Sequence, residues 1–349
     1  MNFSKYIKLK EKIISKESKV FIIAEAGINH NGSISNAKKL IDIAVKAKVD
    51  AVKFQTFKTE SLILKNVSKA PYQKKINSSA ENQFTMLKKL EISKDEILEL
   101  AEYCHSKGII FLITPFDEDA LEELNDLDLA AIKIASTDTT NIPFLLKVAK
   151  KNKPIILSTG MTYYDEIKMV LEILEPINPQ IILLQCTADY PTDPCEVNLS
   201  VLHRFAIDFN ILTGFSDHTT GIGASPYAIP FGAKIIEKHF TIDKNMVGPD
   251  HRASLSPEEL IKFVSIIRDV EKMIGIDIKQ PTISESKNRK SLQKCLVSKQ
   301  SINKGDEYTS KNLTAKRTGG TGISPIYYFD ILGKKANKNY KENEIIDDK

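Results

Sequence analysis

The 349-residue sequence has no tryptophan and only four cysteines: Cys104, Cys186, Cys195 and Cys295. The cysteines show neither a CxxC pair nor zinc-ribbon spacing, which argues against a disulfide-stapled scaffold and against a structural zinc module. Cys104 and Cys186 stand in apolar patterns, so we expect both to be reduced thiols of the core.

An excess of charge and long apolar runs are also lacking. Lys and Arg total 49, Asp and Glu total 45, and the net charge is only +4. This balance predicts neither nucleic acid nor a membrane surface as a partner. The basic segment 1–18 has no apolar stretch typical of a secretory signal, and no run approaches the ~18 apolar residues of a membrane helix. The sequence therefore predicts a cytoplasmic protein.

What the sequence does contain is a regular alternation of two kinds of segment. Short apolar runs bounded by turn residues predict eight strands, at residues 20–27, 50–56, 109–116, 130–136, 154–160, 180–187, 210–217 and 233–240. Amphipathic, helix-like segments lie between most of them, at residues 33–48, 93–108, 141–152, 163–176 and 256–275. Eight such units predict a (β/α)8 TIM barrel, which usually needs ~250 residues. A doubly wound open sheet is the main alternative, although no GxGxxG follows the first strand.

Polar residues stand at or just beyond the end of every predicted strand. In chain order they are Glu25, Lys53, Gln55, Thr114, Lys133, Ser136, Ser158, Thr187, Tyr190, Ser216, Asp217, His218 and His239. A single polar strand end could be a helix cap, but capping alone is a poor explanation for all eight. Because the active site of a TIM barrel lies at the carboxyl ends of its strands, the pattern predicts an active site there.

Two of these strand ends carry a histidine. His218 follows the seventh strand and His239 ends the eighth, so in a barrel their imidazoles would project side by side near Asp217 and Asp250. Two imidazoles with open positions for water and substrate would suit a divalent metal. The plainer explanation is that each histidine only hydrogen-bonds in a polar rim. The pairing beside two aspartates favours the metal.

Two lysines interrupt apolar strands in the same way. Lys53 and Lys133 would be buried, and a buried lysine needs an anionic partner or a lowered pKa. One explanation is a Schiff-base lysine, as in some aldolases. The other is that the two lysines hold a carboxylate and a phosphate, which the nearby Ser136 and Ser158 favour.

Nine motifs then occur in a characteristic order: IAEAGINHNG, VKFQTF, TPFD, KIAS, ILSTGM, CTADYP, GFSDHT, IEKHFT and GPDH. From about residue 20 to the C-terminus, this pattern resembles the sialic acid synthase family. That family includes N-acetylneuraminate synthases and the synthases of legionaminic and pseudaminic acids. The resemblance implies condensation of phosphoenolpyruvate with the open-chain aldehyde of an N-acetylated hexosamine, which gives a nine-carbon 2-keto acid and phosphate.

The resemblance also implies roles for residues at the matching positions. The catalytic residues it implies are Glu25, Lys53, Lys133, His218 and His239. The two histidines would hold a divalent metal, with Mn2+ favoured over Mg2+ or Co2+, that acts as a Lewis acid on the aldehyde oxygen. The substrate-binding residues it implies are Gln55, Thr114, Ser136, Asp138, Ser158, Tyr190, Ser216, Asp250 and Arg317.

The sequence departs from the family pattern at a few positions. Thr137 and Asp138 stand where Gly and Glu are frequent, and the shorter Asp138 puts its hydrogen bonding to the sugar in question. Ala188 replaces an Asn found in some sialic acid synthases, so we assign no contact there. Thr318 replaces the usual proline after the C-terminal Lys-Arg pair.

The sequence divides into four regions, of which the last forms a separate domain. Residues 1–19 are predicted to be an N-terminal extension, 20–275 the barrel, 276–290 a polar linker, and 291–349 a β-rich domain. The last region resembles the antifreeze-like (SAF) domain of the family. In the family this domain caps the partner's barrel in a domain-swapped homodimer, and its arginine, matched by Arg317, reaches the sugar. From its composition alone, the loop around Arg317 would be taken as a solvated basic turn.

Three other functions are alternatives to this one. A synthase acting on a phosphorylated sugar is disfavoured by the C-terminal domain, since such enzymes resemble the barrel alone. A Schiff-base aldolase would act through Lys133, and a non-catalytic sugar-binding protein would not need the complete set of catalytic residues. For the acceptor, the stretches at residues 53–58 and 69–75 resemble legionaminate synthases at least as closely as sialic acid synthases.

Overall fold

The computed structural model describes residues 1–69 and 82–347, and the chain divides into two compact units. The first unit is Met1–Gly275 and the second is Ile276–Lys349. Each unit has its own buried apolar cluster. In the part of the chain that is described, no helix is long and apolar enough to cross a membrane.

The first unit is a barrel of parallel strands. They are β3 (Phe21–Gly27), β4 (Ala51–Thr56), β5 (Ile110–Pro115), β6 (Ile132–Ile134), β7 (Ile155–Ser158), β8 (Ile181–Cys186), β9 (Leu212–Asp217) and β10 (Ala233–His239). Their order is β5-β4-β3-β10-β9-β8-β7-β6, and hydrogen-bonded neighbours run parallel. The outermost strands β5 and β6 also lie in contact, so the sheet nearly closes. The predicted (β/α)8 barrel is confirmed, and the open doubly wound sheet is wrong.

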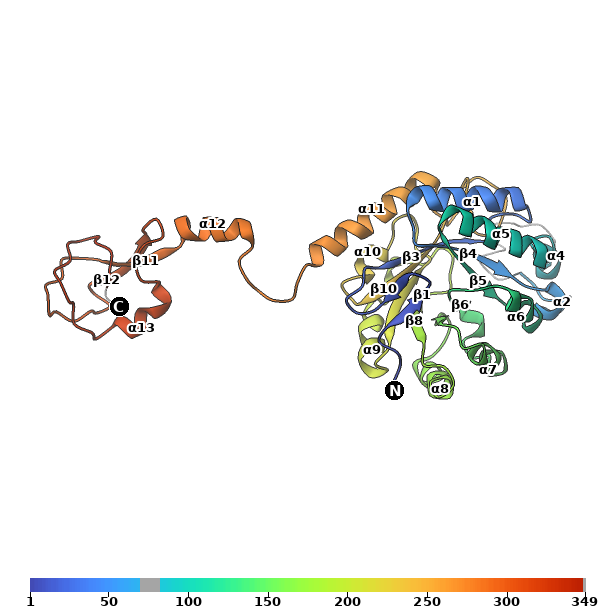
Figure 1. Ribbon diagram of the computed structural model, residues 1–349, viewed down its shortest axis with the longest axis horizontal. Helices are drawn as coiled ribbons and strands as arrows, with labels where there is room; N and C mark the ends of the chain where they lie inside the picture. The colour runs from blue at the N-terminus through green and yellow to red at the C-terminus, as the bar shows by residue number, and fades with distance from the viewer. Residues whose placement is uncertain (70–81, 348–349) are drawn as a thin grey trace. The chain divides into compact units, whose positions relative to one another are not determined.

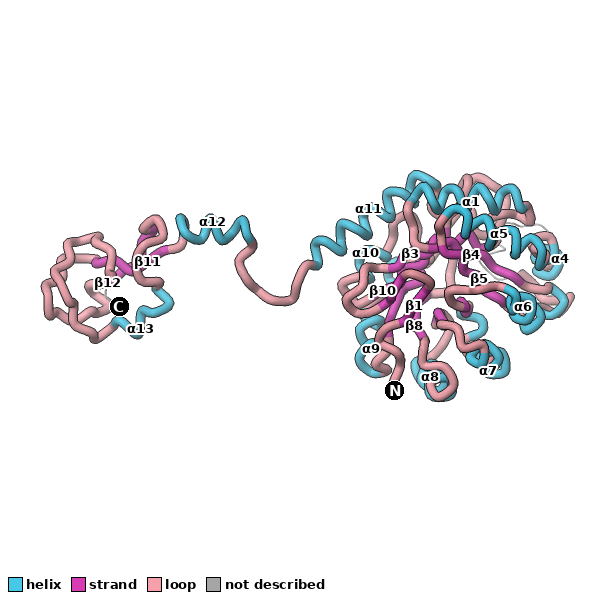
Figure 2. Tube along the Cα trace, viewed as in Figure 1, coloured by secondary structure: helices cyan, strands magenta, loops and turns pink. Residues whose placement is uncertain are grey.

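Helices follow the strands and surround the barrel (Figure 1), as the cyan and magenta segments of Figure 2 also show. They are α1 (Ile34–Ala47), α2 (Thr59–Leu62), α4 (Gln83–Lys88), α5 (Lys94–Lys107), α6 (Glu118–Glu123), α7 (Ile142–Lys150), α8 (Tyr164–Leu174), α9 (Ser200–Asp208), α10 (Ser225–Ala228) and α11 (Pro257–Ile274). Local sequence fixes several of their ends. Ser93 and Glu96 form a capping box at the start of α5, and Gly108 ends that helix in a left-handed conformation.

Side chains along each strand alternate between two apolar clusters. Ile22 and Ile236 belong to the cluster that includes the helices, whereas Ile23 and Ile235 belong to the cluster inside the barrel. Two positions further along the inward-facing rows, the apolar side chains give way to Glu25 on β3 and to Glu237 on β10. The alternation therefore carries polar groups into the carboxyl-terminal end of the barrel.

The predicted N-terminal extension is a packed part of the first unit. It forms an antiparallel hairpin of β1 (Ile7–Leu9) and β2 (Lys12–Ile14). Ile7, Leu9 and Ile14 are fully or almost fully buried and join the cluster inside the barrel. The hairpin thus covers the amino-terminal ends of the strands, opposite the polar end.

The second unit is small and built on one antiparallel pair, β11 (Lys294–Ser298) with β12 (Leu313–Arg317), followed by the short helix α13 (Tyr328–Ile331). Its core includes Tyr308 and Tyr340. The segment predicted to be an irregular linker contains a helix, α12 (Ile283–Leu292). A capping box of Thr282 and Glu285 starts this helix, and none of its residues is buried, so it lacks the apolar periodicity that would have predicted it.

Candidate active site

The carboxyl-terminal end of the barrel opens into a cavity of about 760 Å³. Thirteen of the fourteen predicted site residues line it: Glu25, Lys53, Gln55, Thr114, Lys133, Ser136, Asp138, Ser158, Tyr190, Ser216, His218, His239 and Asp250. They come from all eight strands or from the loops that follow them, as the barrel geometry requires. The fourteenth, Arg317, is an exposed residue at the end of β12 in the second unit.

Four charged side chains form the buried floor of this cavity. Lys53 Nζ lies 2.8 Å from Glu25 Oε2 and 3.8 Å from Glu237 Oε2. Lys133 Nζ lies 3.5 Å from Glu237 Oε1 and donates a hydrogen bond of 2.8 Å to Ser158 Oγ. All four residues are less than 5% exposed. Two lysines and two glutamates therefore balance each other's charge in a region from which water is largely excluded.

Further hydrogen bonds fix the orientation of these charges. Gln55 Nε2 donates to Glu25 Oε1 at 2.9 Å, and Lys53 Nζ donates to Thr114 Oγ1 at 3.0 Å. Ser216 Oγ donates to Glu237 Oε1 at 3.0 Å. The lysines are thus held in place before any ligand arrives, in an arrangement suited to a small anion.

The four charged groups differ in the direction of their pKa shifts. Burial alone would lower the pKa of Lys53, but Glu237 and Glu25 outweigh it and raise that pKa. Burial raises the pKa of Glu25, despite the adjacent Lys53. Burial alone would raise the pKa of Glu237 as well, but Lys133 and Lys53 outweigh it and lower that pKa. Burial lowers the pKa of Lys133 in spite of the nearby Glu237. The two carboxylates therefore differ in direction: the pKa of Glu237 is lowered by the two lysines, and that of Glu25 is raised by burial.

Glu237 is a site residue that sequence reasoning missed. The sequence does contain a pattern that predicts it. Glu237 precedes His239 by two positions on β10, and residues two apart on a strand face the same side. Two buried lysines also call for two carboxylates, and Glu25 supplies only one.

The two histidines do lie next to each other. The ring centroids of His218 and His239 are 5.4 Å apart, and the Tyr190 ring lies 4.0 Å from the first and 5.6 Å from the second. His218 Nδ1 donates a hydrogen bond of 2.7 Å to the Thr187 carbonyl, so Nε2 is the nitrogen that would bind a metal when the ring is neutral. His239 Nδ1 is buried and has no hydrogen-bond partner among the described residues.

Burial also keeps His239 neutral. Burial, together with nearby His218, holds the pKa of His239 well below its ordinary value. A neutral imidazole with an unused nitrogen is the form that binds a metal. The residues present therefore fit a divalent cation bound by two imidazoles. Among the described residues, no group of three or more His, Cys, Asp or Glu is arranged to hold a metal, so substrate or water would have to supply the remaining ligands.

Asp217, which was expected beside the histidines, faces the other way. Its carboxylate pairs with Lys238 Nζ at 3.0 Å and accepts hydrogen bonds from Ser225 and Thr219. Asp217 alternates with Ser216 and His218, so its side chain packs toward the helices and not into the cavity. Asp250 does line the cavity, and burial raises its pKa to about 6.

Asp138, at one of the departures from the family pattern, is buried at the cavity wall. Its Oδ1 accepts a hydrogen bond of 3.0 Å from Asn141, and burial raises its pKa. At another departure, Ala188 lines the cavity as well. Of the segment 69–75 that bears on the acceptor, residues 70–75 lie outside the described part of the chain.

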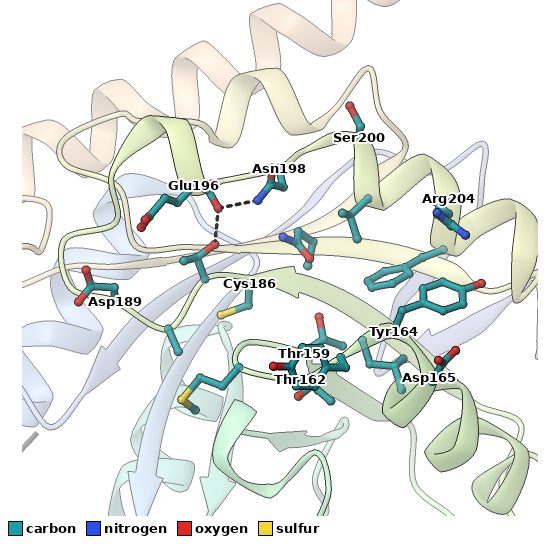
Figure 3. Close-up of a pocket in the computed structure, with 18 residues that line it drawn as sticks. Thr159, Thr162, Tyr164, Asp165, Cys186, Asp189, Glu196, Asn198, Ser200 and Arg204 are labelled. Carbon is teal, nitrogen blue, oxygen red and sulfur yellow. Dashed lines mark hydrogen bonds between the residues drawn. The ribbon is translucent and has the colours of Figure 1, made fainter.

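Cys186 occupies a different environment from the core position predicted for it. All four cysteines are free, and the Cys186 Sγ lies 3.8 Å from His218 Nδ1 at the cavity wall. Cys186 also lines a second cavity, of about 930 Å³, together with residues of α8 and α9 such as Tyr164 and Arg204 (Figure 3). Met161, Cys186, Ala188 and Asp189 line both cavities. Cys104, by contrast, is the buried core thiol that was predicted.

The sequence is similar to that of known proteins along most of its length. The NeuB family matches residues 40–279 of the chain. The N,N'-diacetyllegionaminic acid synthase of Campylobacter jejuni is 46% identical over 94% of this chain and 99% of that protein. This chain belongs to the NeuB family. The resemblance to sialic acid synthases is thereby confirmed.

A comparison with solved structures agrees with these sequence matches. The solved N-acetylneuraminic acid (sialic acid) synthetase of Leptospira borgpetersenii superimposes with a TM-score of 0.74 and 34% identity. The alignment covers 83% of this chain and 98% of the other.

The C-terminal region also occurs in a relative named for a phosphorylated product. The human N-acetylneuraminate-9-phosphate synthase is 38% identical over 93% of this chain and 91% of its own length. A match of that extent must continue beyond Gly275 into the second unit. A relative named for a phosphorylated product therefore shares both regions, and the C-terminal domain does not exclude a phosphorylated acceptor.

Proposed function

We propose that this protein condenses phosphoenolpyruvate with an N-acetylated hexosamine and that its product is N,N'-diacetyllegionaminic acid. The cluster of Lys53, Lys133, Glu25 and Glu237 beside paired histidines carries the proposal, since it offers an anion site next to a candidate metal site. The 46% identity to a legionaminic acid synthase supports this acceptor class over N-acetylmannosamine. The acceptor would then be 2,4-diacetamido-2,4,6-trideoxymannose.

In this proposal the cavity floor binds phosphoenolpyruvate. Lys53 and Lys133 supply two positive charges, and Ser136, Ser158 and Ser216 supply hydroxyl donors around them. These groups would fix the enol so that its C3 faces the aldehyde carbon of the acceptor. Gln55, Asp138, Tyr190 and Asp250 lie around the same cavity, where they would contact the sugar.

Glu25 is the proposed proton carrier. As C3 forms the new carbon–carbon bond, the aldehyde oxygen gains a proton, and a water molecule attacks C2 while losing one. Collapse of the tetrahedral C2 centre breaks its bond to the bridging oxygen and releases inorganic phosphate. Burial raises the pKa of Glu25, which brings this carboxyl group closer to the range in which it can both take and return a proton.

His218 and His239 are the proposed metal ligands, with Mn2+ favoured over Mg2+ or Co2+. When bound, such a cation would supply Lewis acidity at the acceptor aldehyde oxygen. His239→Ala should lower the affinity for Mn2+, measured by titration calorimetry, and should reduce kcat on the order of 10²-fold. Chelation should abolish turnover and added cation should restore it. Full activity in excess chelator, with no metal found by elemental analysis, would contradict this role.

Parallel assays decide the acceptor and the reaction together. Phosphate release from phosphoenolpyruvate would be measured with the diacetamido sugar, with N-acetylmannosamine and with N-acetylmannosamine 6-phosphate. The highest kcat/KM is expected for the diacetamido sugar. No release with any of the three would contradict the proposed reaction and would favour a non-catalytic sugar-binding protein. Covalent trapping of pyruvate on Lys133 by borohydride would instead favour the Schiff-base aldolase.

Isotope labelling tests the bond that breaks. Phosphoenolpyruvate carrying 18O in its bridging position should deliver the label to phosphate, because carbon–oxygen cleavage leaves that oxygen on phosphorus. Label retained in the keto acid would show phosphorus–oxygen cleavage and would contradict the mechanism.

We further propose that the second unit is an SAF domain that completes the site of a partner chain in a homodimer through Arg317. Arg317 is exposed at the end of β12, and the second unit has its own core. Mixing Arg317→Ala protein with Glu25→Ala protein under exchange conditions should then restore activity, because one site of each mixed dimer is intact. Random exchange would make about a quarter of all sites competent. Demonstrated exchange without recovered activity would contradict the domain swap.

A further inference from the structure

Two loops beside the candidate active site are tied together by buried side chains that the proposed reaction does not use. The first loop, residues 28–32, follows β3, and the second, residues 240–255, follows β10 and carries Asp250. Asn29, Thr241, His251 and Ser254 are each no more than 1% exposed. Polar groups buried to this degree are costly unless they are paired, so the bonds between them report what the loops are built to hold.

His251 bridges the two loops. Its Nδ1 lies 2.6 Å from Thr241 Oγ1, and its Nε2 lies 3.2 Å from Asn31 Oδ1. The Asn31 amide nitrogen donates to the Val247 carbonyl at 2.9 Å, which fixes the amide so that its oxygen faces the imidazole. The His251 proton therefore resides on Nε2, and Nδ1 accepts from the Thr241 hydroxyl, whose oxygen also lies 3.2 Å from the Asp243 carbonyl. Burial lowers the pKa of His251 and so favours this neutral form.

Asn29 fastens the other end of the same loop. Its Nδ2 donates to the Phe240 carbonyl at 2.8 Å and to Ser254 Oγ at 3.0 Å. Ser254 Oγ in turn donates to the Asp250 carbonyl at 2.7 Å. Asp250 thus lies between two anchored points, with its side chain directed into the cavity.

His251 is closely packed against the backbone of residue 248. A methyl group added at Gly248 would come within 2.5 Å of His251 Cδ2 and within 3.0 Å of Asn31 Oδ1. The loop can therefore approach the imidazole only because residue 248 has no side chain.

We propose that His251, with Asn29 and Asn31, is a positioning residue that holds Asp250 over the acceptor part of the cavity. This inference rests on the proposed function, in which Asp250 contacts the sugar and the lysines of the floor hold phosphoenolpyruvate. Loosening the loop should therefore affect the acceptor and spare phosphoenolpyruvate, because Lys53 and Lys133 are fixed by Glu25, Glu237 and Ser158 and not by this loop.

The test separates the two substrates. His251→Phe keeps a planar ring and removes both hydrogen bonds, so the KM for the acceptor should rise about tenfold or more, with less than about a twofold change in the KM for phosphoenolpyruvate. His251→Gln can still donate to Asn31 and should show a smaller increase. If His251→Phe does not fold, Asn31→Gly makes the same test, because Asn31 is only half-buried and glycine adopts its positive φ of 53° without strain. An equal change in both KM values, or no change for the acceptor, would overturn the proposal.

Asn178→Leu serves as the control. Asn178 is also fully buried and bonded to backbone, through the Lys153 carbonyl, but it lies between α8 and β8 at the opposite end of the barrel. This variant should lose stability without altering either KM. Hydrogen exchange of residues 247–254 gives a readout that needs no turnover: it should be faster in His251→Phe than in wild type. An inactive wild-type protein would refute the proposed function alone, and unchanged exchange would refute the network.

Discussion

The two ends of the barrel strands differ in chemistry although they share one backbone geometry. At the amino-terminal end the inward-facing side chains are apolar, such as Ile23 and Ile235, and the β1–β2 hairpin covers them. Two positions further along, the same rows carry Glu25 and Glu237, which face an open cavity. The difference shows how this fold separates two tasks along the strand axis. One end supplies apolar burial, and the other end uses the resulting rigidity to hold four charges at fixed positions.

The largest expected effect comes from removing a charge at the polar end. Lys133→Met should reduce kcat/KM for phosphoenolpyruvate on the order of 10³-fold, because it removes an anion-binding cation and leaves Glu237 with less compensation. Phosphate release measures the loss. Lys238→Met is the matched control, since Lys238 is equally buried but pairs with Asp217 on the outer side of β10. It should lower stability and leave the KM for phosphoenolpyruvate within about twofold of wild type. A comparable loss in both variants would contradict the distinction between the cavity-facing Lys133 of β6 and the outward-facing Lys238 of β10.

The next effect concerns the shared carboxylate. Glu237→Gln keeps the shape and a hydrogen-bond acceptor for Ser216 but removes the negative charge between Lys53 and Lys133. We expect kcat to fall on the order of 10²-fold. Without that anion the pKa of Lys133 should fall further, so the alkaline limb of the pH–rate profile should move to lower pH. An unmoved limb would contradict the coupling. Glu259→Gln, which affects an ion pair with Lys244 on the surface, should change neither quantity.

The apolar end should respond in the opposite way. Leu9→Ala removes a fully buried side chain from the cluster inside the barrel and should lower the free energy of unfolding by about 2–4 kcal/mol. At temperatures where the protein stays folded, kcat/KM should not change. Ile13→Ala, in the same hairpin but 57% exposed, should cost less than about 0.5 kcal/mol. A large loss of activity in folded Leu9→Ala protein would show that the two ends are not independent.

The smallest expected effect is a change in the free energy of unfolding when Asp250, at the polar end of the barrel, is replaced. Burial raises the folded-state pKa of Asp250 from 3.8 to about 6, so the folded protein holds this proton more tightly than the unfolded chain does. The stabilisation is fully present below pH ~4 and is lost as pH rises through about 6. Asp250→Asn should therefore raise the free energy of unfolding at pH 8 by roughly 1–3 kcal/mol relative to wild type, and by much less at pH 4. Urea titrations at both pH values measure this, and an equal change at both would contradict it.

Much of this arrangement could be predicted from the sequence because it depends on local patterns. Short apolar runs and amphipathic segments predicted the eight strands and the helices between them, and the polar strand ends predicted which end of the barrel opens into the cavity. The hairpin was missed because β1 and β2 are three residues each, too short to show a period. Helix α12 was missed because none of its residues is buried.

The errors at the site have a different origin. Asp217 was assigned to the wrong face because strand-end position was weighed without the alternation of side chains, which places Ser216 and His218 inward and Asp217 outward. Glu237 was missed because the same alternation was not considered: it lies two positions before His239 on β10 and therefore also faces inward. Contacts between loops distant in sequence, such as Asn31 with His251, have no local pattern, because they depend on how β3 and β10 pair as neighbours in the sheet.

The β1–β2 hairpin has a consequence for the order of folding. The hairpin precedes all eight barrel strands in the sequence, yet its apolar side chains share a cluster with residues as distant in sequence as Leu212 and Ile235. Those surfaces exist only once the later strands have assembled, so we expect the hairpin to dock after the rate-limiting step of folding. Contacts made after the rate-limiting step slow unfolding without speeding folding. Its loss should therefore leave the refolding rate nearly unchanged and shorten the lifetime of the native state.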